Sequence, residues 1–293
     1  DTHNIAIGFQ AGTGITTGLY NTLVGGLAGD ALTDADFNVA IGVVALSTDT
    51  LGSKSVAIGH NTLNSQNFTT ATDTHNVAIG FQAGTGITTG VQNTLIGSLA
   101  GDAITDADFN VAIGINALTT DTLGGKSVAV GHSALANQNF TTATDSYNTA
   151  VGDVAGTAIT TGTQNTIVGG LAADALTTGF QNVAIGVDAL SNDRAGNKSV
   201  AIGRSALSSQ NFSSDTDGLN TAVGYFAGVG ITTGKRNAFL GAEAGASNTT
   251  GESNTYIGRQ AGTSMTTGSN NTIIGRYNGN QDSLDLRTSS NNI

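Results

Sequence analysis

The strongest constraint on this chain is a short phrase that returns at regular intervals. Variants of Asn-x-Ala-Ile-Gly, first seen at residues 4–8, open sixteen consecutive coils. The coils are 17 residues long, except that the last coil in each of the first three groups of four has 21 residues. Because 17 residues cannot hold a strand, a crossover helix and two loops, this period predicts one turn of a solenoid made of short strands and tight corners.

The coils are themselves grouped. We expect an all-β, parallel β-solenoid shaft over residues 1–279, with residues 280–293 starting the next segment. The chain opens with Asp-Thr-His, which matches the end of a repeat at residues 73–75, so we expect it to begin in the middle of the architecture. The superrepeats are 4–75, 76–147 and 148–219, followed by a fourth and more regular group at 220–279.

Two coil positions, counted from the opening Asn or Ser, carry structural signals. The fifth is Gly in all sixteen coils, which indicates a positive φ or the close approach of another strand. The first is Asn in thirteen coils, and we expect it to form a stacked polar ladder. The structural candidates in the first two superrepeats are Gly8, Gly25, Gly42, Gly59, Gly80, Gly97, Gly114 and Gly131, with Asn4, Asn21, Asn38 and Asn76.

Positions two to four of each coil predict a strand, and the stretch Ile15–Gly18 predicts a second strand that ends at a glycine corner. The fourth position is always aliphatic, so we expect it to face the core. On this interpretation Ile5 and Ile7 share the core face, and Ala6 lets a neighbour approach the other face. The absence of Pro agrees with a backbone whose N–H groups donate to a ladder.

The strands do not alternate between apolar and polar residues. Val39, Ala40 and Ile41 are apolar on both faces, as are the equivalent residues of several other coils. One face can fill the interior of the coil, and the other must be covered by something else. A partner chain is the economical cover, because two or three aliphatics per coil return only about 1.5–3 kcal/mol each on burial.

Composition excludes several partners. The chain has a net charge of −11 and only ten Lys and Arg residues, which disfavours nucleic acid and anionic membranes. It has no cysteine and no run of 18 apolar residues, so neither a disulfide framework nor membrane insertion is expected. No cofactor is expected either.

Acidic residues recur in the first two superrepeats in an oxygen-rich pattern that Ca²⁺ could use. A solvated acidic edge is the preferred interpretation, because the third superrepeat keeps only Asp174 and the calcium-binding β-roll signature is absent. The histidines are not kept at equivalent positions of the other superrepeats, where Tyr, Leu or Arg replaces them, and this argues against a catalytic role. Lys54, Lys126 and Lys198 are expected to neutralise carboxylates at a shared edge. The candidate calcium ligands are Asp30, Asp34, Asp36, Asp102, Asp106 and Asp108.

The 21-residue coils carry extra residues, which in solenoids emerge as loops on one side, often the binding side. The preferred interpretation is a corner in which Phe packs under the loop; the alternative is a surface contact with a partner. The candidate contact residues are Asn67, Phe68, Asn139, Phe140, Asn211 and Phe212.

Phrases such as SVAIG at 55–59 and NTAVG at 148–152 resemble the head repeats of trimeric autotransporter adhesins. In that family they form a left-handed parallel β-roll around a threefold axis. The closer similarity is to repeat regions of phage tail-fibre-like proteins, on NTAVGYFAG at 220–228 and LDLRTSSNNI at 284–293, and it extends over residues 4–293. The resemblance implies left-handed β-roll or β-helix coils in an intertwined or packed homotrimer, although these coils are longer than the usual adhesin-head coil.

We therefore expect a structural protein, not an enzyme: a segment of a phage tail fibre or similar surface appendage that extends or presents a region for host attachment. It would be located in the virion tail fibre or at the cell surface, with other copies of itself and a host cell-surface glycan or protein as partners. The first alternative is a bacterial trimeric adhesin stalk or head. The others are an ice-binding solenoid, disfavoured because the adjacent Thr16 and Thr17 would point to opposite sides, and a glycan-cleaving tailspike, which needs a carboxylate pair in a groove that breaks the repeat.

Overall fold

The computed structural model describes residues 3–281 and 284–293. Asp1 and Thr2, at the start of the expected shaft, and Asp282 and Ser283, in the expected following segment, lie outside the described residues. All secondary-structure elements in the described ranges are strands, which confirms an all-β parallel solenoid of about sixteen turns. The chain forms two compact units, Asp1–Tyr147 and Asn148–Ile293.

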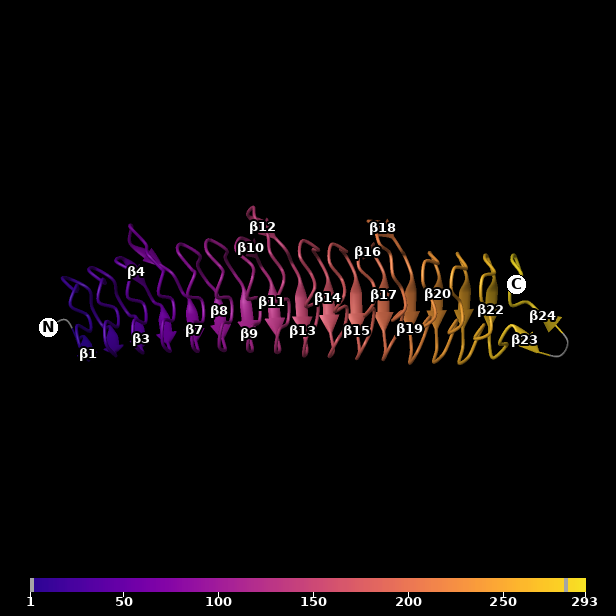
Figure 1. Cartoon of the computed structure of the whole chain (residues 1–293), viewed down its shortest axis with the longest axis horizontal. Helices are drawn as coiled ribbons and strands as arrows, with labels where there is room; N and C mark the ends of the chain where they lie inside the picture. The colour runs from indigo at the N-terminus through magenta and orange to yellow at the C-terminus, as the bar shows by residue number, and fades with distance from the viewer. Residues whose placement is uncertain (1–2, 282–283) are drawn as a thin grey trace. The chain divides into compact units, whose positions relative to one another are not determined.

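In the first unit, each coil contributes one three-residue strand, and the strands stack in parallel (Figure 1). Equivalent positions pair in register, so that Ile5 lies opposite Thr22 and Val39 opposite Val56. The strand predicted at positions two to four is confirmed. The strands are β1 (Ile5–Ile7), β2 (Thr22–Val24), β3 (Val39–Ile41), β5 (Val56–Ile58), β7 (Val77–Ile79), β8 (Thr94–Ile96), β9 (Val111–Ile113) and β11 (Val128–Val130).

The second unit repeats this arrangement. Its strands are also parallel and in register, with Thr149 opposite Thr166 and Thr255 opposite Thr272. The strands are β13 (Thr149–Val151), β14 (Thr166–Val168), β15 (Val183–Ile185), β17 (Val200–Ile202), β19 (Thr221–Val223), β20 (Ala238–Leu240), β21 (Thr255–Ile257) and β22 (Thr272–Ile274).

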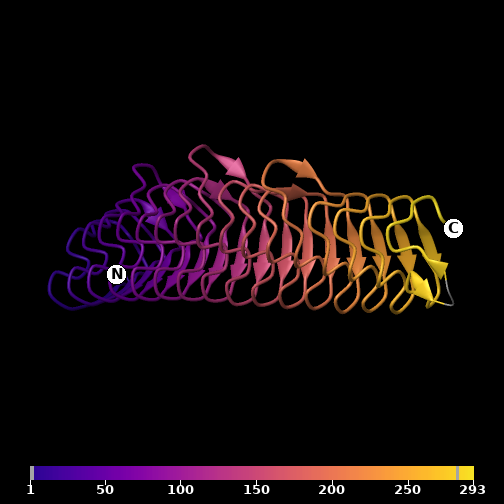
Figure 2. The same cartoon turned by 45° about the vertical axis from the view of Figure 1, so that its right-hand side comes forward.

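Each 21-residue coil adds a short parallel pair next to the main stack, and the loops that lead into these pairs project from their unit (Figure 2). The coil returns to the main strand after the pair, so the extra residues lie outside the stacked strands. The pairs are β4 (Gly52–Ser53) with β6 (Thr72–Asp73), β10 (Gly124–Gly125) with β12 (Thr144–Asp145), and β16 (Gly196–Asn197) with β18 (Thr216–Asp217).

The second strand predicted at Ile15–Gly18 is wrong, because this stretch is a bend. The backbone N–H groups of Thr16 and Gly18 both donate to the carbonyl oxygen of Thr33 in the next coil, at 3.0 and 3.1 Å. In a ladder the donors alternate along a strand, whereas here they converge on one acceptor. The bends still stack coil on coil, but without extended backbone.

The assignment of strand faces was also wrong. Position three, not position four, points into the coil: Ala40, Ala57 and Leu23 have no exposed surface. Ile41 and Leu240 at position four are 37% and 51% exposed. The third position suits the narrow interior because it is Ala in most coils, and the Ala of position eight is buried as well.

The prediction for the fifth-position glycines is confirmed on both counts. Their φ angles lie between 109° and 145°, a region that side chains disfavour. In addition, a Cβ atom on Gly8 or Gly25 would lie 2.4 or 2.3 Å from the carbonyl oxygen of the equivalent glycine in the next coil. Any side chain at this position would force neighbouring coils apart.

The stack continues beyond the boundary expected at residue 279. Asn292 donates its backbone N–H to Asn271 Oδ1 at 3.0 Å, which is the contact that opening asparagines make elsewhere. The coil that opens at Asn271 therefore has 21 residues, so the fourth group also has a long last coil. This coil differs in detail, because β23 (Asn280–Gln281) and β24 (Leu284–Asp285) pair antiparallel.

Candidate functional site

Positions two and four of the strands form an outward-facing surface in each unit, which we call the outer strand face. Position two is half-buried in most strands, as in Val77 and Val183, and position four ranges from half-buried to exposed. Ile7 and Ile274 are 61% and 74% exposed. This face is built from aliphatic side chains and Thr, and its residues stay half-buried or exposed among the described residues, so it is a candidate interaction surface.

The sixth position, just beyond the glycine corner, is mixed: some coils carry a large apolar side chain there, and others carry His60, His132, Asp153, Arg204, Arg259 or Arg276. Large apolar side chains there are about half exposed or more, from 45% for Tyr225 to 75% for Phe9. The other large apolar residues at this position are Val43, Phe81, Ile115 and Val187.

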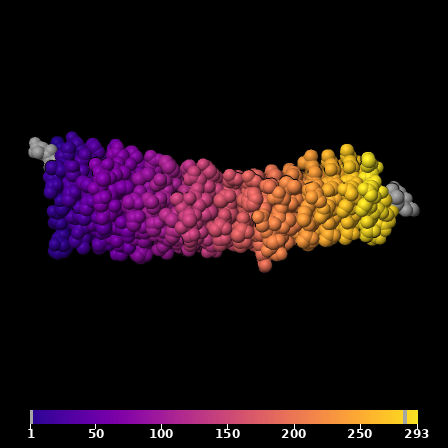
Figure 3. All heavy atoms as spheres, turned by 90° about the horizontal axis from the view of Figure 1, so that it is seen from above, coloured from indigo at the N-terminus to yellow at the C-terminus, as the bar shows by residue number. Residues whose placement is uncertain are grey.

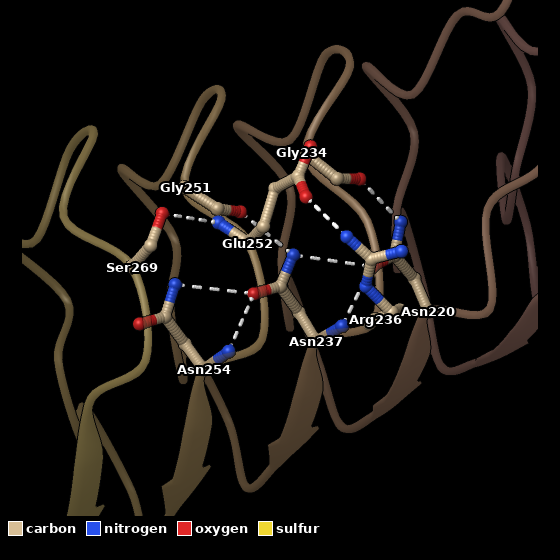
Figure 4. Close-up of polar contacts among 8 residues, drawn as sticks. All are labelled: Asn220, Gly234, Arg236, Asn237, Gly251, Glu252, Asn254 and Ser269. Atoms are coloured by element: carbon tan, nitrogen blue, oxygen red, sulfur yellow. Dashed lines mark hydrogen bonds and ion pairs between the residues drawn. The ribbon is translucent and has the colours of Figure 1, made fainter. Parts of the chain in front are cut away.

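The opening asparagines form the expected ladder, seen in the second unit in Figure 4. Asn237 donates its backbone N–H to Asn220 Oδ1 at 2.9 Å, and its Nδ2 donates to the carbonyl oxygen of Gly251 at 2.9 Å. Asn254 repeats these contacts with Asn237 and Gly268. These side chains are buried, and each ties its own coil together while it joins the next one.

The ladder continues through the coils that open with Ser. The Ser side chain is too short to make the contacts of an opening Asn, and a glutamine later in the coil contacts the next opening Asn instead. Ser55 still donates its backbone N–H to Asn38 Oδ1 at 2.8 Å. Gln66, eleven residues later, donates to Ser55 Oγ at 2.9 Å and accepts from Asn76 Nδ2 at 2.9 Å. Gln66 therefore bridges to the next opening Asn across the longer coil.

Gln66 and its equivalents Gln138 and Gln210 each donate to a buried carboxylate that was not predicted from the sequence. Asp49 Oδ2 accepts from Gln66 Nε2 at 2.6 Å, while its Oδ1 accepts from the backbone N–H groups of Gly52 and Phe68 at 3.1 and 3.0 Å. Asp121 and Asp193 make the same contacts. Position twelve of the coils could have indicated this pair. In each of the first three superrepeats it is Ile or Leu in the first two coils, Asp in the third coil and Gln in the fourth.

These carboxylates have no cation beside them in this network. Burial raises the pKa of Asp193, and the hydrogen bonds from Gln210 and from backbone N–H groups oppose this shift. The network satisfies each carboxylate with neutral donors, as a buried polar group requires. Its role is to fix the geometry of the long coil.

The candidate calcium ligands do not converge. Asp34 and Asp106 accept from Thr17 and Thr89 Oγ1, each at 2.5 Å. Asp36 and Asp108 accept backbone N–H groups, each at 2.7 Å. Asp30 is half-buried, and Asp102 accepts from Thr119. Within residues 3–281 and 284–293, no group of three or more acidic or histidine side chains is placed to hold a metal ion.

The phenylalanines of the long coils are not surface residues. Phe68, Phe140 and Phe212 are only 7%, 6% and 4% exposed, so their proposal as surface contacts is corrected and the corner interpretation is confirmed. They pack under the loops because an aromatic ring there buries more apolar area than any other residue of the loop. Asn67 and Asn139 are half-buried and Asn211 is exposed. The exposed loop tips are residues 69–71, 141–143 and 213–215.

The lysines before the Ser coils do pair with carboxylates, as predicted. Lys126 Nζ lies 2.6 Å from Asp145 and Lys198 Nζ lies 2.7 Å from Asp217; Lys54 pairs with Asp73. The lysine lowers the pKa of Asp145 and of Asp217. Each pair is exposed and links the two strands of a short parallel pair.

The histidines lie in surface contacts. His3 stacks on Tyr20, with ring centroids 5.2 Å apart, and His60 stacks on Phe81 at 5.5 Å.

On the face drawn in Figure 3, neither unit shows the deep hollow that a groove for a polysaccharide would need.

The reason given against ice binding does not hold. Thr16 and Thr17 were expected on opposite faces of a strand, but both are exposed at a bend. The Thr16 hydroxyl nevertheless donates to the carbonyl oxygen of Thr33 at 3.2 Å, and Thr33 repeats this contact with Thr50 at 3.0 Å. This threonine ladder uses its hydroxyls to join neighbouring coils.

Comparison with known proteins gives no relative: no protein-family model, no curated protein and no solved structure matches this chain. Among the residues that the structure describes, there is no helix that has both the length and the apolar character needed to cross a bilayer.

Proposed function

We propose that this chain is a structural segment of a surface fibre, assembled as a homotrimer through its outer strand faces. The fibre is a phage tail fibre or a similar appendage, and it presents a region that attaches to a host receptor. A bacterial trimeric adhesin stalk or head is the alternative, and it uses the same assembly. The threefold state and the location rest on the resemblance of the repeats.

The observation that carries the proposal is the composition of the outer strand face. Two outward positions on each of sixteen strands contain only Ile, Val, Leu, Ala and Thr, although the chain has 31 charged residues. Depletion of charge at the centre is characteristic of protein–protein interfaces. Burial of one such aliphatic side chain stabilises an assembly by about 1.5–3 kcal/mol, so even partial coverage of this face favours association.

The exposure and composition of the loop tips suit contact with a host surface. The exposed tips of the long coils carry Thr, Ser, Ala and Asp. Small polar side chains of this kind can contact a host glycan or protein weakly, and repetition in three copies of the chain multiplies such contacts through avidity.

Light scattering in solution tests the assembly. The expected mass is three times 29.1 kDa. A mass near that of a single chain under native conditions contradicts the proposal.

A pair of variants tests the surface. Ile185→Asp places a charge on the outer strand face, where the side chain is half-buried in the single chain. We expect the trimer to dissociate while circular dichroism still reports a β-fold. Thr178→Asp is the matched control, because Thr178 is exposed and the equivalent residue in the first superrepeat is Asp34. A trimer that persists in Ile185→Asp shows that this face is not the interface.

A further inference from the structure

The first unit contains a pocket of about 360 Å³ beside the second long coil. Its wall comes from the coil that ends at Phe109, from β10 and from β12, the pair labelled at the edge of the stack in Figure 1. The side chains that matter here are Asp106, Asp108, Phe109, Lys126 and Asp145, together with the bare backbone of Gly125.

The pocket arises at a break in a side-chain ladder. At position sixteen, the side chains of Asp36, Ser53, Asp108, Asn197 and Ser269 each accept the backbone N–H of the equivalent residue one coil earlier. Asp36 donates to Ser53 Oγ at 2.9 Å, and Glu252 donates to Ser269 Oγ at 2.9 Å in the second unit (Figure 4). Phe180 donates to Asn197 Oδ1 at 3.0 Å.

Gly125 occupies this position in the second superrepeat and has no side chain to accept the bond. The backbone N–H of Asp108 is therefore left without a protein acceptor in the described part of the chain. A backbone donor that is kept from its usual partner and lines a pocket is a binding group for a ligand oxygen.

The same pocket offers acceptors. Asp106 and Asp108 each use Oδ1 for a contact within the fold, to Thr89 Oγ1 and to the backbone N–H of Val91. The Oδ2 atom of each has no hydrogen bond to another described residue. Lys126 adds a cationic donor, held in place by Asp145.

Charge and shape narrow the ligand class. Three carboxylates and one ammonium group give the lining a formal charge of −2, which disfavours phosphates and acidic sugars. The carboxylates are not grouped for a metal ion. The Phe109 ring is 49% exposed and provides an apolar platform. A pyranose has hydroxyl groups that both donate and accept, and an apolar face that stacks on such a ring.

We propose that this pocket is a binding site for a neutral saccharide. Sugar hydroxyls donate to Asp106 and Asp108 and accept from the Asp108 N–H and from Lys126, while the apolar face of the ring lies on Phe109. This site does not depend on the proposed trimer, since all of its residues belong to one unit of one chain.

The superrepeats supply matched variants. Gly125→Ser introduces the residue found at Ser53, whose hydroxyl takes up the equivalent N–H. A Cβ atom on Gly125 would lie 3.0 Å from the carbonyl oxygen of Asp108. The same coil spacing carries a side chain at Ser53, since the next residue donates to the equivalent carbonyl in both places, Lys54 to Asp36 at 2.9 Å and Lys126 to Asp108 at 3.0 Å. Ser53→Gly makes the reverse change beside Asp34, Asp36 and Phe37, the equivalents of the pocket residues.

Saturation-transfer difference NMR with methyl α-glucopyranoside, methyl β-galactopyranoside and N-acetylglucosamine tests the site, with glucuronate as the anionic control. We expect at least one neutral sugar to bind the natural protein. The affinity for this sugar should fall about tenfold or more in Gly125→Ser. The Ser side chain would occupy part of the pocket, and its hydroxyl would accept the Asp108 N–H, so the sugar would lose one hydrogen bond and some of its contacts. Ser53→Gly should increase the number of bound sugars.

Three results overturn the proposal: no response to any of the neutral sugars, equal binding by Gly125→Ser, or equal binding of glucuronate. Light scattering on the same samples separates loss of sugar binding from loss of assembly.

Discussion

The carbonyl oxygen of Gly59 lies 2.2 Å from the point that a Cβ atom on Gly42 would occupy. Gly42 also has a φ of 138°. The two coils therefore approach more closely than any side chain at this position permits. Since the same relationship recurs along each unit, the distance between coils depends on these glycines.

Replacement of Gly42 by Ala should lower the free energy of unfolding by about 3 kcal/mol or more, since the backbone strain alone costs about 1–3 kcal/mol and the contact adds to it. Urea denaturation followed by circular dichroism measures this loss. Gly26→Ala is the control: its Cβ meets no atom closer than 4.0 Å, so its effect should stay within about 0.5 kcal/mol. Equal losses in the two variants would contradict the stacking argument.

Asp49→Ala should destabilise the first unit strongly. It leaves the backbone N–H groups of Gly52 and Phe68 without their acceptor and removes one of the two acceptors of Gln66 Nε2, and each buried orphan donor costs about 1–3 kcal/mol. Asp34→Ala, which removes one exposed contact to Thr17, should cost about 1 kcal/mol or less. Denaturation midpoints compare the two, and similar midpoints would show that the buried network contributes little.

Two carboxyls beside the third long coil, Asp193 in the coil before it and Asp217 within it, should have pKa values shifted in opposite directions. Burial raises the pKa of Asp193, so the stability linked to this group increases as the pH falls through its folded-state pKa towards the unfolded value near 3.8. Lys198 lowers the pKa of Asp217, so its contribution is present above pH 3.8 and is lost as the pH falls through the lowered value. Carboxyl ¹³C NMR titration measures both; Asp193 titrating below Asp217 would refute the prediction.

Tyr256→Phe should leave stability unchanged or raise it by about 1 kcal/mol. The amides of Asn271 and Asn248 lie near the hydroxyl and oppose the rise of its pKa, but neither makes a hydrogen bond of good geometry to it. Burial raises the pKa of this hydroxyl to about 12. Phe239 occupies the equivalent interior position one coil earlier and stacks on Tyr256 at 5.2 Å, so a Phe ring fits there. Thermal unfolding measures the change, and a clear loss of stability would reveal a partner for the hydroxyl.

The repeat made the main features of the fold predictable. An invariant Gly and a nearly invariant Asn at fixed spacing lead directly to close stacking and to the ladder that joins Asn21 to Asn38. The inward and outward faces could not be assigned in the same way. When Val39, Ala40 and Ile41 are all apolar, hydrophobicity alone does not distinguish them, and only the size of the interior selects Ala40.

The missed features lie where the repeat changes. Asp49 and Gln66 replace an aliphatic pair, and a search for invariant residues passes over such a substitution. The length of the last coil was not predictable from the phrase, and it follows from the backbone N–H of Asn292, which donates to Asn271 Oδ1. The pocket at Gly125 lies where Gly replaces the Ser53 of the first superrepeat. The sequence does not show that the Ser53 hydroxyl accepts the backbone N–H of Asp36, so the effect of this replacement on Asp108 could not be predicted.

The four extra residues of each long coil leave the strand register unchanged, since Val56 pairs with Val77 across the first of them just as Val39 pairs with Val56. The loop tips are therefore natural insertion points. A foreign peptide placed between Thr70 and Ala71 adds only the slowly growing entropy of a longer loop. Equivalent tips at 141–143 and 213–215 allow the same peptide to be displayed at several defined points along the chain, which makes this protein a scaffold for spaced multivalent presentation.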